Sequence, residues 1–398
     1  MHSTNTFVDG MRMPQLSPSM TGFVFGSGAG FAFLVGMPVV TALIFAIGLA
    51  SLRRRSWLGL VAFGASYMCA SSTWFFPGTS SIQEFALAVL GTAAIGAVFH
   101  GLPNLVLRWK YGWTIWPLLI TAAEQGASHL GMVGVPLGLI GLHTPIGALA
   151  TLGSLTITSI VLGYLIVLPI ALPKFKYISL GGVVLLYLVG LPIEQKPMPI
   201  KIGAISHNPP SVEKWNPDTA PAILADLLER SKAHEGADLI VWSENAVTTT
   251  FSIAEALDQV REVNTPLLFG MTRYTSDDDY SFTNSAIFKL GDEYQISNKQ
   301  RLVPVIEAGL PPFKKPAVLP AERRIFEMPD GTRFLTILCY EVSFSIPKTD
   351  LDGVDFVIVI SAETGMFRSM TNQVYGNMAI ARSLETGLPI QRISDVPL

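Results

Sequence analysis

The sequence predicts a helical membrane domain followed by an α/β domain, and three observations lead to this interpretation. Of the 398 residues, 49% are hydrophobic and only 14% are charged, against about 25% charged in an average soluble domain. Residues 22–195 hold few charges between long apolar runs, whereas residues 196–398 have the composition of a soluble protein. The second part alternates short apolar runs with amphipathic segments, which favours an α/β sheet covered on both faces. We therefore place the domain boundary between Pro192 and Pro199.

Residues 1–21 are polar and lack the basic start and short apolar stretch of a cleavable signal peptide, so we expect a flexible tail. Each apolar segment after this tail has about the 17 to 25 residues, or more, that cross a bilayer as a helix. The fourth segment is interrupted by Glu124, Gln125 and His129, which predicts a kinked or partly re-entrant piece. About six spans are expected, over residues 22–50, 56–76, 83–107, 113–141, 147–171 and 177–195.

Basic residues fall in alternate connections between these predicted spans. The connections around residues 77–82 and 142–146 carry no Lys or Arg. By the positive-inside rule the basic connections face the cytoplasm, so everything after the sixth span lies on the outer side. In a bacterial cell this predicts a multi-pass inner-membrane protein with a periplasmic second domain. The basic connections contain Arg53, Arg54 and Arg55, then Arg108 and Lys110, then Lys174 and Lys176.

Composition and spacing also exclude several classes of function. A net charge of −3 without a basic stripe argues against a nucleic-acid partner. Cys69 and Cys339 lie in different halves of the chain, so we expect no disulfide between them. There is no zinc-type Cys/His spacing and no phosphate-binding glycine motif, so we expect neither a metal nor a cofactor.

Within the second part, apolar runs and amphipathic segments predict strands and helices in alternation. The expected helices cover residues 221–234, 252–263 and 372–386. The expected strands cover residues 202–205, 238–242, 266–270, 284–290, 294–297, 333–338, 355–361 and 389–393.

Three of these strands are followed by side chains that can perform acyl chemistry, namely Glu244, Lys299 and Cys339. A carboxylate can accept the proton of a thiol, and the thiolate can then attack an acyl carbon. A lysine ammonium in a water-poor site can stabilise the oxyanion that results. Each residue alone also has a structural interpretation, since a lone cysteine is often a small buried hydrophobe and a strand-end Glu or Lys is often solvated.

Four motifs together resemble the carbon–nitrogen hydrolase (nitrilase) superfamily. They are similar above all to its membrane branch, which contains the apolipoprotein N-acyltransferases and the TraB proteins of plasmid conjugal transfer. The resemblance implies a helical membrane domain followed by a nitrilase-like α-β-β-α sandwich. The motifs are Trp-Ser-Glu-Asn-Ala at 242–246, Asn-Lys-Gln-Arg-Leu-Val-Pro at 298–304, Cys-Tyr-Glu at 339–341 and Ala-Arg-Ser-Leu-Glu-Thr-Gly-Leu-Pro at 381–389.

By this resemblance Glu244 is the general base, Lys299 stabilises the oxyanion and Cys339 is the nucleophile. The implied activity is transfer of a fatty acyl group from a phospholipid, through a thioester on the cysteine, to an amine such as the N-terminus of a lipoprotein. An amidase of the same superfamily is one alternative, and a TraB-like transfer component with weak or no catalysis is another. Supporting or substrate-binding roles are implied for Glu307, Tyr340 and Glu341.

The chain departs from the family pattern in three places. The family's Phe-Gly-Glu appears here as Val-Ile-Glu at 305–307. Where the acyltransferases carry Ser-Asn-Asp-x-Trp-Phe, this chain has Ser-Ala-Glu-Thr-Gly-Met-Phe at 361–367. The chain also stops at Leu398, where the family continues through further strands and a closing membrane helix. We therefore expect a sandwich that is truncated at its C-terminus, and this departure favours the weakly catalytic alternative.

Overall fold

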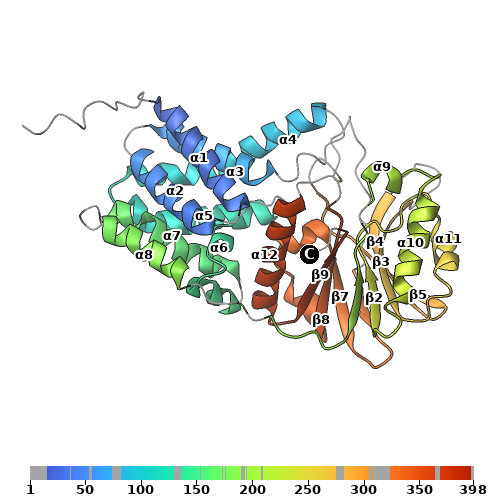
Figure 1. Ribbon diagram of the computed structural model, residues 1–398. Helices are drawn as coiled ribbons and strands as arrows, with labels where there is room; N and C mark the ends of the chain where they lie inside the picture. Colours follow the sequence, from blue (N-terminus) through green and yellow to red (C-terminus); the bar gives the residue numbers. More distant parts are fainter. Residues whose placement is uncertain are drawn as a thin grey trace, which may run out of the picture.

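A computed structural model gives the structure of the protein, which forms a helical part beside a two-sheet sandwich (Figure 1). The helical part ends with helix α8 at Leu188, and the first strand of the sandwich begins at Ile202. The structure describes residues 16–35, 37–52, 56–73, 82–129, 136–152, 154–172, 174, 176–189, 193, 195–207, 209–274, 282–303, 307, 323–363 and 368–395.

The helical part is built from short helices, several of which differ from the predicted spans. The segment 22–50 is divided at Pro38, because proline has no backbone N–H and begins a helix more readily than it continues one. Helix α1 already begins at Pro18, inside the segment predicted as a tail. In segment 113–141, helix α5 continues through Glu124 and Gln125 and ends at His129, and residues 130–135 lie outside the described residues. The helices are α1 (Pro18–Leu34), α2 (Pro38–Leu52), α3 (Trp57–Ser71), α4 (Ile82–Ile95), η2 (Gly96–Gly101), η3 (Leu102–Arg108), α5 (Gly112–His129), α6 (Leu137–Ile140), η4 (Pro145–Leu152), α7 (Leu155–Ala171) and α8 (Lys176–Leu188).

One continuous helical run of the described chain, Phe85–Arg108, has both the length and the apolar composition needed to cross a membrane. Pro38–Leu52, Trp57–Ser71 and Leu155–Leu168 are apolar but shorter. Within the described residues, the six predicted spans are therefore not all present as full-length helices. Of the basic connections, residues 53–55 lie outside the described residues.

Helices α1 and α3 pack with their backbones in contact. A Cβ atom on Gly22 would lie 2.0 Å from the carbonyl oxygen of Gly59, and one on Gly26 would lie 2.2 Å from that of Phe63. No side chain fits at such distances, so the small residues permit this packing, as they do in many membrane helix pairs.

The sandwich consists of two mixed sheets. The first sheet has the order β1-β2-β3-β4-β5. The neighbouring pairs β1–β2 and β2–β3 are parallel, and the pairs β3–β4 and β4–β5 are antiparallel. In the second sheet, with the order β6-β7-β8-β9, β6 is antiparallel to β7, and the other pairs are parallel. The strands are β1 (Ile202–Ile205), β2 (Leu239–Trp242), β3 (Leu267–Tyr274), β4 (Phe282–Leu290), β5 (Glu293–Asn298), β6 (Ile325–Glu327), β7 (Arg333–Leu338), β8 (Phe356–Ser361) and β9 (Ile390–Ser394).

Alternation along each strand divides its side chains between two cores. On β7, Phe334 and Leu338 join the core between the two sheets, whereas Leu335 and Ile337 face outward. Helices cover both outer faces, which gives the expected α-β-β-α layers (Figure 1). The helices of this part are α9 (Ser211–Lys214), α10 (Ala220–Lys232) and α11 (Ile253–Gln259) beside the first sheet, η6 (Cys339–Ser343) and η7 (Lys348–Leu351) after β7, and α12 (Arg368–Thr386) on the second sheet.

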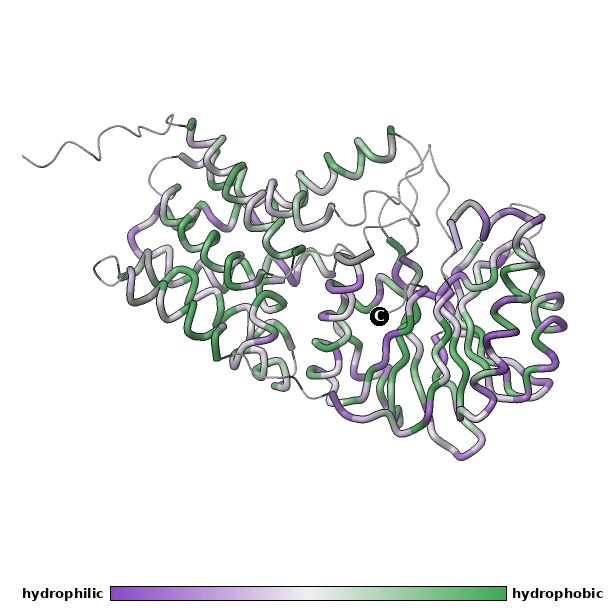
Figure 2. Tube along the Cα trace, viewed as in Figure 1, coloured by the Kyte–Doolittle hydropathy of each residue, from purple (hydrophilic) through white to green (hydrophobic). Residues whose placement is uncertain are grey.

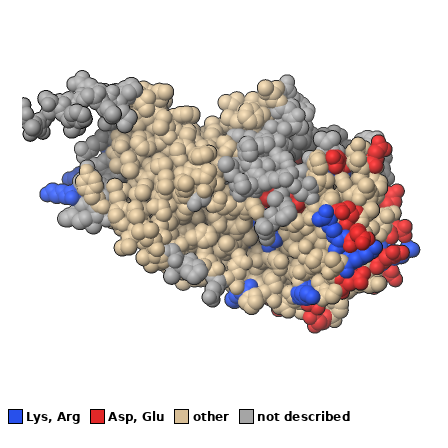
Figure 3. All heavy atoms as spheres, in the orientation of Figure 1, with Lys and Arg blue, Asp and Glu red and all other residues tan. Residues whose placement is uncertain are grey.

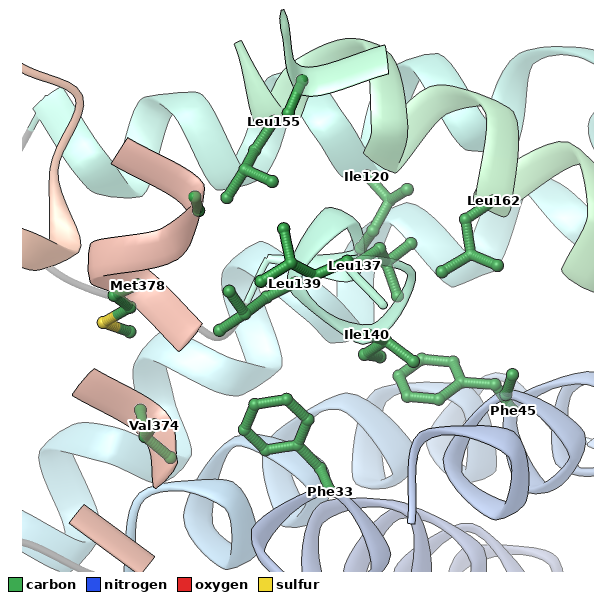
Figure 4. Close-up of a cluster of buried hydrophobic side chains, with 14 of the residues drawn as sticks. Phe33, Phe45, Ile120, Leu137, Leu139, Ile140, Leu155, Leu162, Val374 and Met378 are labelled. Carbon is green, nitrogen blue, oxygen red and sulfur yellow. The ribbon is translucent and has the colours of Figure 1, made fainter. Parts of the chain in front are cut away.

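Helix α12 packs between the second sheet and the helical part. Its residues Val374 and Met378 belong to one continuous apolar core that also contains Phe33 and Leu139 of the helical part (Figure 4). Polar contacts cross the same boundary, since the Asn377 amide oxygen lies 2.8 Å from His143 Nε2. The two parts are therefore joined by a shared core as well as by the chain between them.

The surface differs between the two parts. Large exposed apolar side chains such as Phe23, Trp57 and Leu90 lie almost entirely on the described helices before residue 190. The tube in Figure 2 shows hydrophobic residues throughout these helices. In the outer helices of the sandwich, hydrophobic residues alternate with hydrophilic ones. On the face shown in Figure 3, most of the Asp, Glu, Lys and Arg side chains lie on the sandwich.

Gly270 on β3 permits the close approach of the chain that follows β2. A Cβ atom at this position would lie 2.5 Å from the Cα atom of Glu244 and 2.9 Å from the backbone nitrogen of Asn245. Asn245 itself has a φ of 53°, in the left-handed region that few residues other than glycine adopt. The position of Glu244 therefore depends on the absence of a side chain at residue 270.

We predict that Gly270→Ala destabilises the protein by about 1–3 kcal/mol, because the added methyl group overpacks a buried backbone contact. This corresponds to a fall in melting temperature of about 2–4 °C for each kcal/mol in a domain of this size. Thermal unfolding followed by near-UV circular dichroism measures the change. The control is Gly236→Ala, where the nearest atom to the new Cβ is 3.9 Å away; an equal effect of both substitutions contradicts the prediction.

Candidate active site

Each of the three predicted catalytic residues follows a strand. Glu244 lies two residues after β2, Lys299 directly follows β5, and Cys339 directly follows β7. β5 runs parallel to β2, because two antiparallel pairings separate it from β3. The carboxyl ends of these strands present their polar side chains to one another at the edge of the sandwich.

Glu244 is a buried carboxylate with both oxygens hydrogen-bonded. Its Oε1 accepts from Asn284 Nδ2 at 2.6 Å and from Lys299 Nζ at 3.1 Å. Its Oε2 accepts from the backbone N–H of Ala362 at 2.9 Å. The side chain is therefore fixed by donors from β4, from the end of β5 and from the segment after β8.

Lys299 lies between two carboxylates. Its Nζ donates to Glu244 Oε1 and, at 2.8 Å, to Glu307 Oε1, while the lysine is only 1% exposed. The other oxygen of Glu307 accepts from the backbone N–H of Val303 at 2.8 Å. The predicted supporting residue Glu307 thus contacts the predicted oxyanion-stabilising residue directly.

Cys339 occupies a strained turn at the start of η6. Its φ is 47°, and Cys339 and Asn245 are the non-glycine residues of the described chain with positive φ. Such strain costs of order 1–3 kcal/mol and is common where a side chain must be aimed at a site. The thiol is 3% exposed, and its Sγ lies 3.6 Å from the hydroxyl oxygen of Tyr375 on α12.

The electrostatics of the site link all of these groups. Burial raises the pKa of the Cys339 thiol well above its usual range; the carboxylates of Glu244 and Glu307 raise it further, and the Lys299 ammonium opposes the shift. Burial also raises the pKa of Glu244, although Lys299 lowers it in part. Burial alone would lower the pKa of Lys299, but the two carboxylates raise it well above the ordinary value. The lysine therefore stays charged, and Glu244 is a stronger base than an exposed glutamate.

Glu341 and Tyr340, the other predicted supporting residues, have structural contacts. Glu341 accepts from the backbone N–H groups of Gln300 at 2.9 Å and of Leu338 at 3.0 Å, and it forms an ion pair with Arg323. These bonds tie the chain after Lys299 to the end of β7. Tyr340 packs edge to face on Phe344, with ring centroids 5.2 Å apart.

A second buried charge cluster supports the segment that donates to Glu244. The backbone N–H of Glu363 donates to Asp395 at 2.6 Å, and Asp395 also pairs with Lys214 Nζ at 2.9 Å. The Glu363 carboxylate pairs with Arg392. This cluster holds residues 361–363, the described portion of the segment where the sequence departs from the acyltransferase pattern; residues 364–367 lie outside the described residues.

Sequence reasoning did not identify Asn284, the Ala362 amide or Tyr375 as parts of the site. The sequence indicates a role for Asn284 only weakly, since it is a polar residue at the start of an apolar strand. Tyr375 lies on a predicted helix, and nothing in its spacing indicates which strand end it meets. Among the described residues there is no group of three or more His, Cys, Asp and Glu side chains that could hold a metal ion.

Comparison with curated proteins identifies two relatives of one kind, and no protein-family model matches the chain. The apolipoprotein N-acyltransferase of Shewanella oneidensis is 23% identical over 332 residues, which cover 72% of this chain and 60% of that protein. The apolipoprotein N-acyltransferase of Pseudomonas syringae pv. tomato is 25% identical over 406 residues, which cover 88% of this chain and 78% of that protein. The chain thus spans less than two thirds of the length of the Shewanella protein.

Among solved structures, the chain is similar to an amidase from Nesterenkonia sp., with 18% identity, a TM-score of 0.36 and coverage of 52% of this chain and 78% of that one. It is also similar to a glutamine-dependent NAD+ synthetase from Acinetobacter baumannii, with 19% identity, a TM-score of 0.31 and coverage of 41% and 32%. Both scores are low, so the description of the fold depends on the strand order given above. The curated relatives confirm that this chain resembles the membrane branch of the carbon–nitrogen hydrolase superfamily, that of the apolipoprotein N-acyltransferases.

Proposed function

We propose that the protein is a membrane-bound acyltransferase that moves a fatty acyl group from a phospholipid to an amine, such as the N-terminus of a lipoprotein. The observation that carries this proposal is the buried Glu244–Lys299–Glu307 ion cluster in the electrostatic neighbourhood of the Cys339 thiol. The names of the two curated relatives support this choice of reaction.

In the first half of the reaction, Glu244 takes the proton of the Cys339 thiol, and the thiolate attacks the ester carbonyl of the phospholipid. The raised pKa of Glu244 suits this step, because it makes the carboxylate a stronger base than an exposed glutamate. The Lys299 ammonium neutralises the oxyanion that forms. The ester C–O bond then breaks, the alkoxide of the lysophospholipid takes the proton from Glu244, and the acyl group remains on sulfur as a thioester.

In the second half, an amine replaces the phospholipid. The amine attacks the thioester carbonyl and loses a proton to Glu244, the C–S bond breaks, and the thiolate of Cys339 recovers that proton. The products are an amide and the free enzyme. Water in place of the amine would give a fatty acid, which is the outcome expected for an amidase-like hydrolase with the same residues.

The apolar surface of the helical part is consistent with an acyl donor that is a membrane phospholipid. Its described surface carries many large apolar side chains, among them Phe23, Phe31 and Trp57, that would be costly to expose to water. Figure 3 draws few charged side chains over the same region. We propose that these helices lie in the bilayer as a multi-pass domain, which would hold the thiol beside a substrate that cannot leave the membrane.

We predict that the wild-type protein, incubated with phospholipid carrying a labelled acyl chain, acquires label on Cys339 that hydroxylamine removes, because thioesters are cleaved by this nucleophile. The Cys339→Ala variant is expected to acquire none. The matched control is Cys69→Ala, which removes the other cysteine of the chain and is expected to label normally. Absence of label from the wild type contradicts the acyltransferase proposal, and release of labelled fatty acid without an amine favours the hydrolase.

We predict that the rate of thioester formation falls as the pH is lowered through the pKa of Glu244, since only the carboxylate accepts the thiol proton. The raised pKa of Glu244 places this loss at a higher pH than for an exposed glutamate. Glu244→Gln is expected to lower the rate by about 10²–10⁴-fold and to abolish this limb of the profile. Rapid-quench measurement of the labelled thioester at a series of pH values tests this; an unchanged profile in Glu244→Gln excludes Glu244 as the base.

We predict that the sandwich lies on the periplasmic side of the inner membrane, because Arg108, Lys110, Lys174 and Lys176 fall in connections assigned to the cytoplasm. An alkaline phosphatase fused after residue 395 is then active, and the same enzyme fused after Lys110 is inactive. Green fluorescent protein at the same two positions should give the opposite pattern. Phosphatase activity at both positions, or only after Lys110, contradicts this orientation.

A further inference from the structure

We propose that Tyr375 is a further catalytic group of the same site, whose hydroxyl donates a hydrogen bond to the Cys339 thiolate. This inference rests on the proposed role of Cys339 as the nucleophile. This inference is carried by geometry: the Tyr375 hydroxyl oxygen lies 3.6 Å from Sγ, and Tyr375 belongs to α12, the helix that covers the second sheet.

The surroundings of Tyr375 make its hydroxyl group costly without a polar partner. Tyr375 is 1% exposed, and its neighbours Val374, Met378 and Ala379 on α12 are buried in the apolar core. A phenylalanine would fill the same volume without placing an oxygen in this core. A buried hydroxyl is favourable only when it is hydrogen-bonded, and the neutral Cys339 thiol donates such a bond to the hydroxyl oxygen. Once the thiol has lost its proton, the sulfur can only accept, and the hydroxyl is then the donor.

The charges around Cys339 explain why a neutral donor is needed there. The thiolate would form beside the carboxylates of Glu244 and Glu307, and both raise the pKa of the thiol. One cation, Lys299, is already shared by these two carboxylates at 3.1 and 2.8 Å. A donor that carries no charge of its own stabilises the thiolate without weakening the lysine's bonds to either glutamate.

The phenol is suited to donate a hydrogen bond without losing its proton. Burial raises the pKa of Tyr375 well above its usual range, and the nearby negative charges of Cys339 and Glu244 raise it further. The thiol proton therefore passes to Glu244, and the tyrosine proton stays on its oxygen throughout. The hydrogen bond with Tyr375 is also one of the influences that lower the pKa of the thiol.

The test is the pH dependence of alkylation of Cys339 by iodoacetamide in the full-length protein. Cys69→Ala serves as the background, so that Cys339 is the only cysteine. In this background Tyr375→Phe is expected to slow alkylation near neutral pH by about ten-fold or more, as loss of a hydrogen bond to a charged group does. The profile should also move to higher pH, which a merely structural role of the ring would not cause.

Tyr294→Phe is the matched control, because this half-exposed tyrosine on β5 also loses only its hydroxyl and is expected to leave the profile unchanged. A second variant carries 3,5-difluorotyrosine at position 375, which keeps the ring and makes the hydroxyl a stronger donor. It is expected to move the profile to lower pH, and it keeps the proposal testable if Tyr375→Phe does not fold.

An unchanged profile in either folded variant overturns the role of Tyr375. Alkylation requires no phospholipid, so its result is independent of the acyltransferase activity. If the wild type forms no labelled thioester but Tyr375→Phe shifts the alkylation profile, the proposed function fails and the Tyr375 contact stands. If the thioester forms and the profile does not shift, only the inference about Tyr375 fails.

Discussion

The buried ion cluster of Lys299 with Glu244 and Glu307 is the interaction on which the rest of this site depends. A single cation between two carboxylates loses its hydration, and the Coulomb attraction must offset this cost at short range. The bonds from Asn284 and the Ala362 amide supply further donors to Glu244, so neither of its oxygens is left unpaired. Because the cluster carries one negative charge in excess, any additional anion beside it requires a specific partner.

The two-sheet arrangement is what brings this cluster to the cysteine. The carboxylate and the amine belong to the first sheet and the thiol to the second, so their meeting depends on how the two sheets pack face to face. In this interface Phe288 packs edge to face on Phe334, which stacks on Phe356, with ring centroids 5.3 and 5.2 Å apart. Such rigid packing fixes the separation of the strand ends. The strained turn at Cys339 then aims the thiol.

The sequence predicts the strands of this structure better than its helix breaks or its contacts between distant segments. The strands and the side chains that follow them were predictable, because Glu244 and Cys339 come just after apolar runs and Lys299 comes just after the predicted strand 294–297. The break near Pro38 was missed, since the apolar composition continues through it and hydropathy alone does not register the lost N–H group. Strand β6 was also missed, because only three residues pair at this edge. Tyr375 and the Ala362 amide could not have been predicted, since their contacts depend on packing between distant layers.

Helix α12 belongs structurally to both halves of the molecule. Tyr375 on one of its faces meets Cys339, and two residues later Asn377 contacts His143, while Glu385 near its end accepts from the backbone N–H of Leu155 at 2.7 Å. The sandwich is therefore not a separable module: excised alone, it would present the apolar side of this helix to water. Under the proposed function the helical half lies in the bilayer, and α12 then connects it to the thiol. On that proposal, a tilt of these helices in a thinner or thicker bilayer is expected to reach the sulfur atom through α12, so bilayer thickness becomes a variable in the reactivity of the thiol.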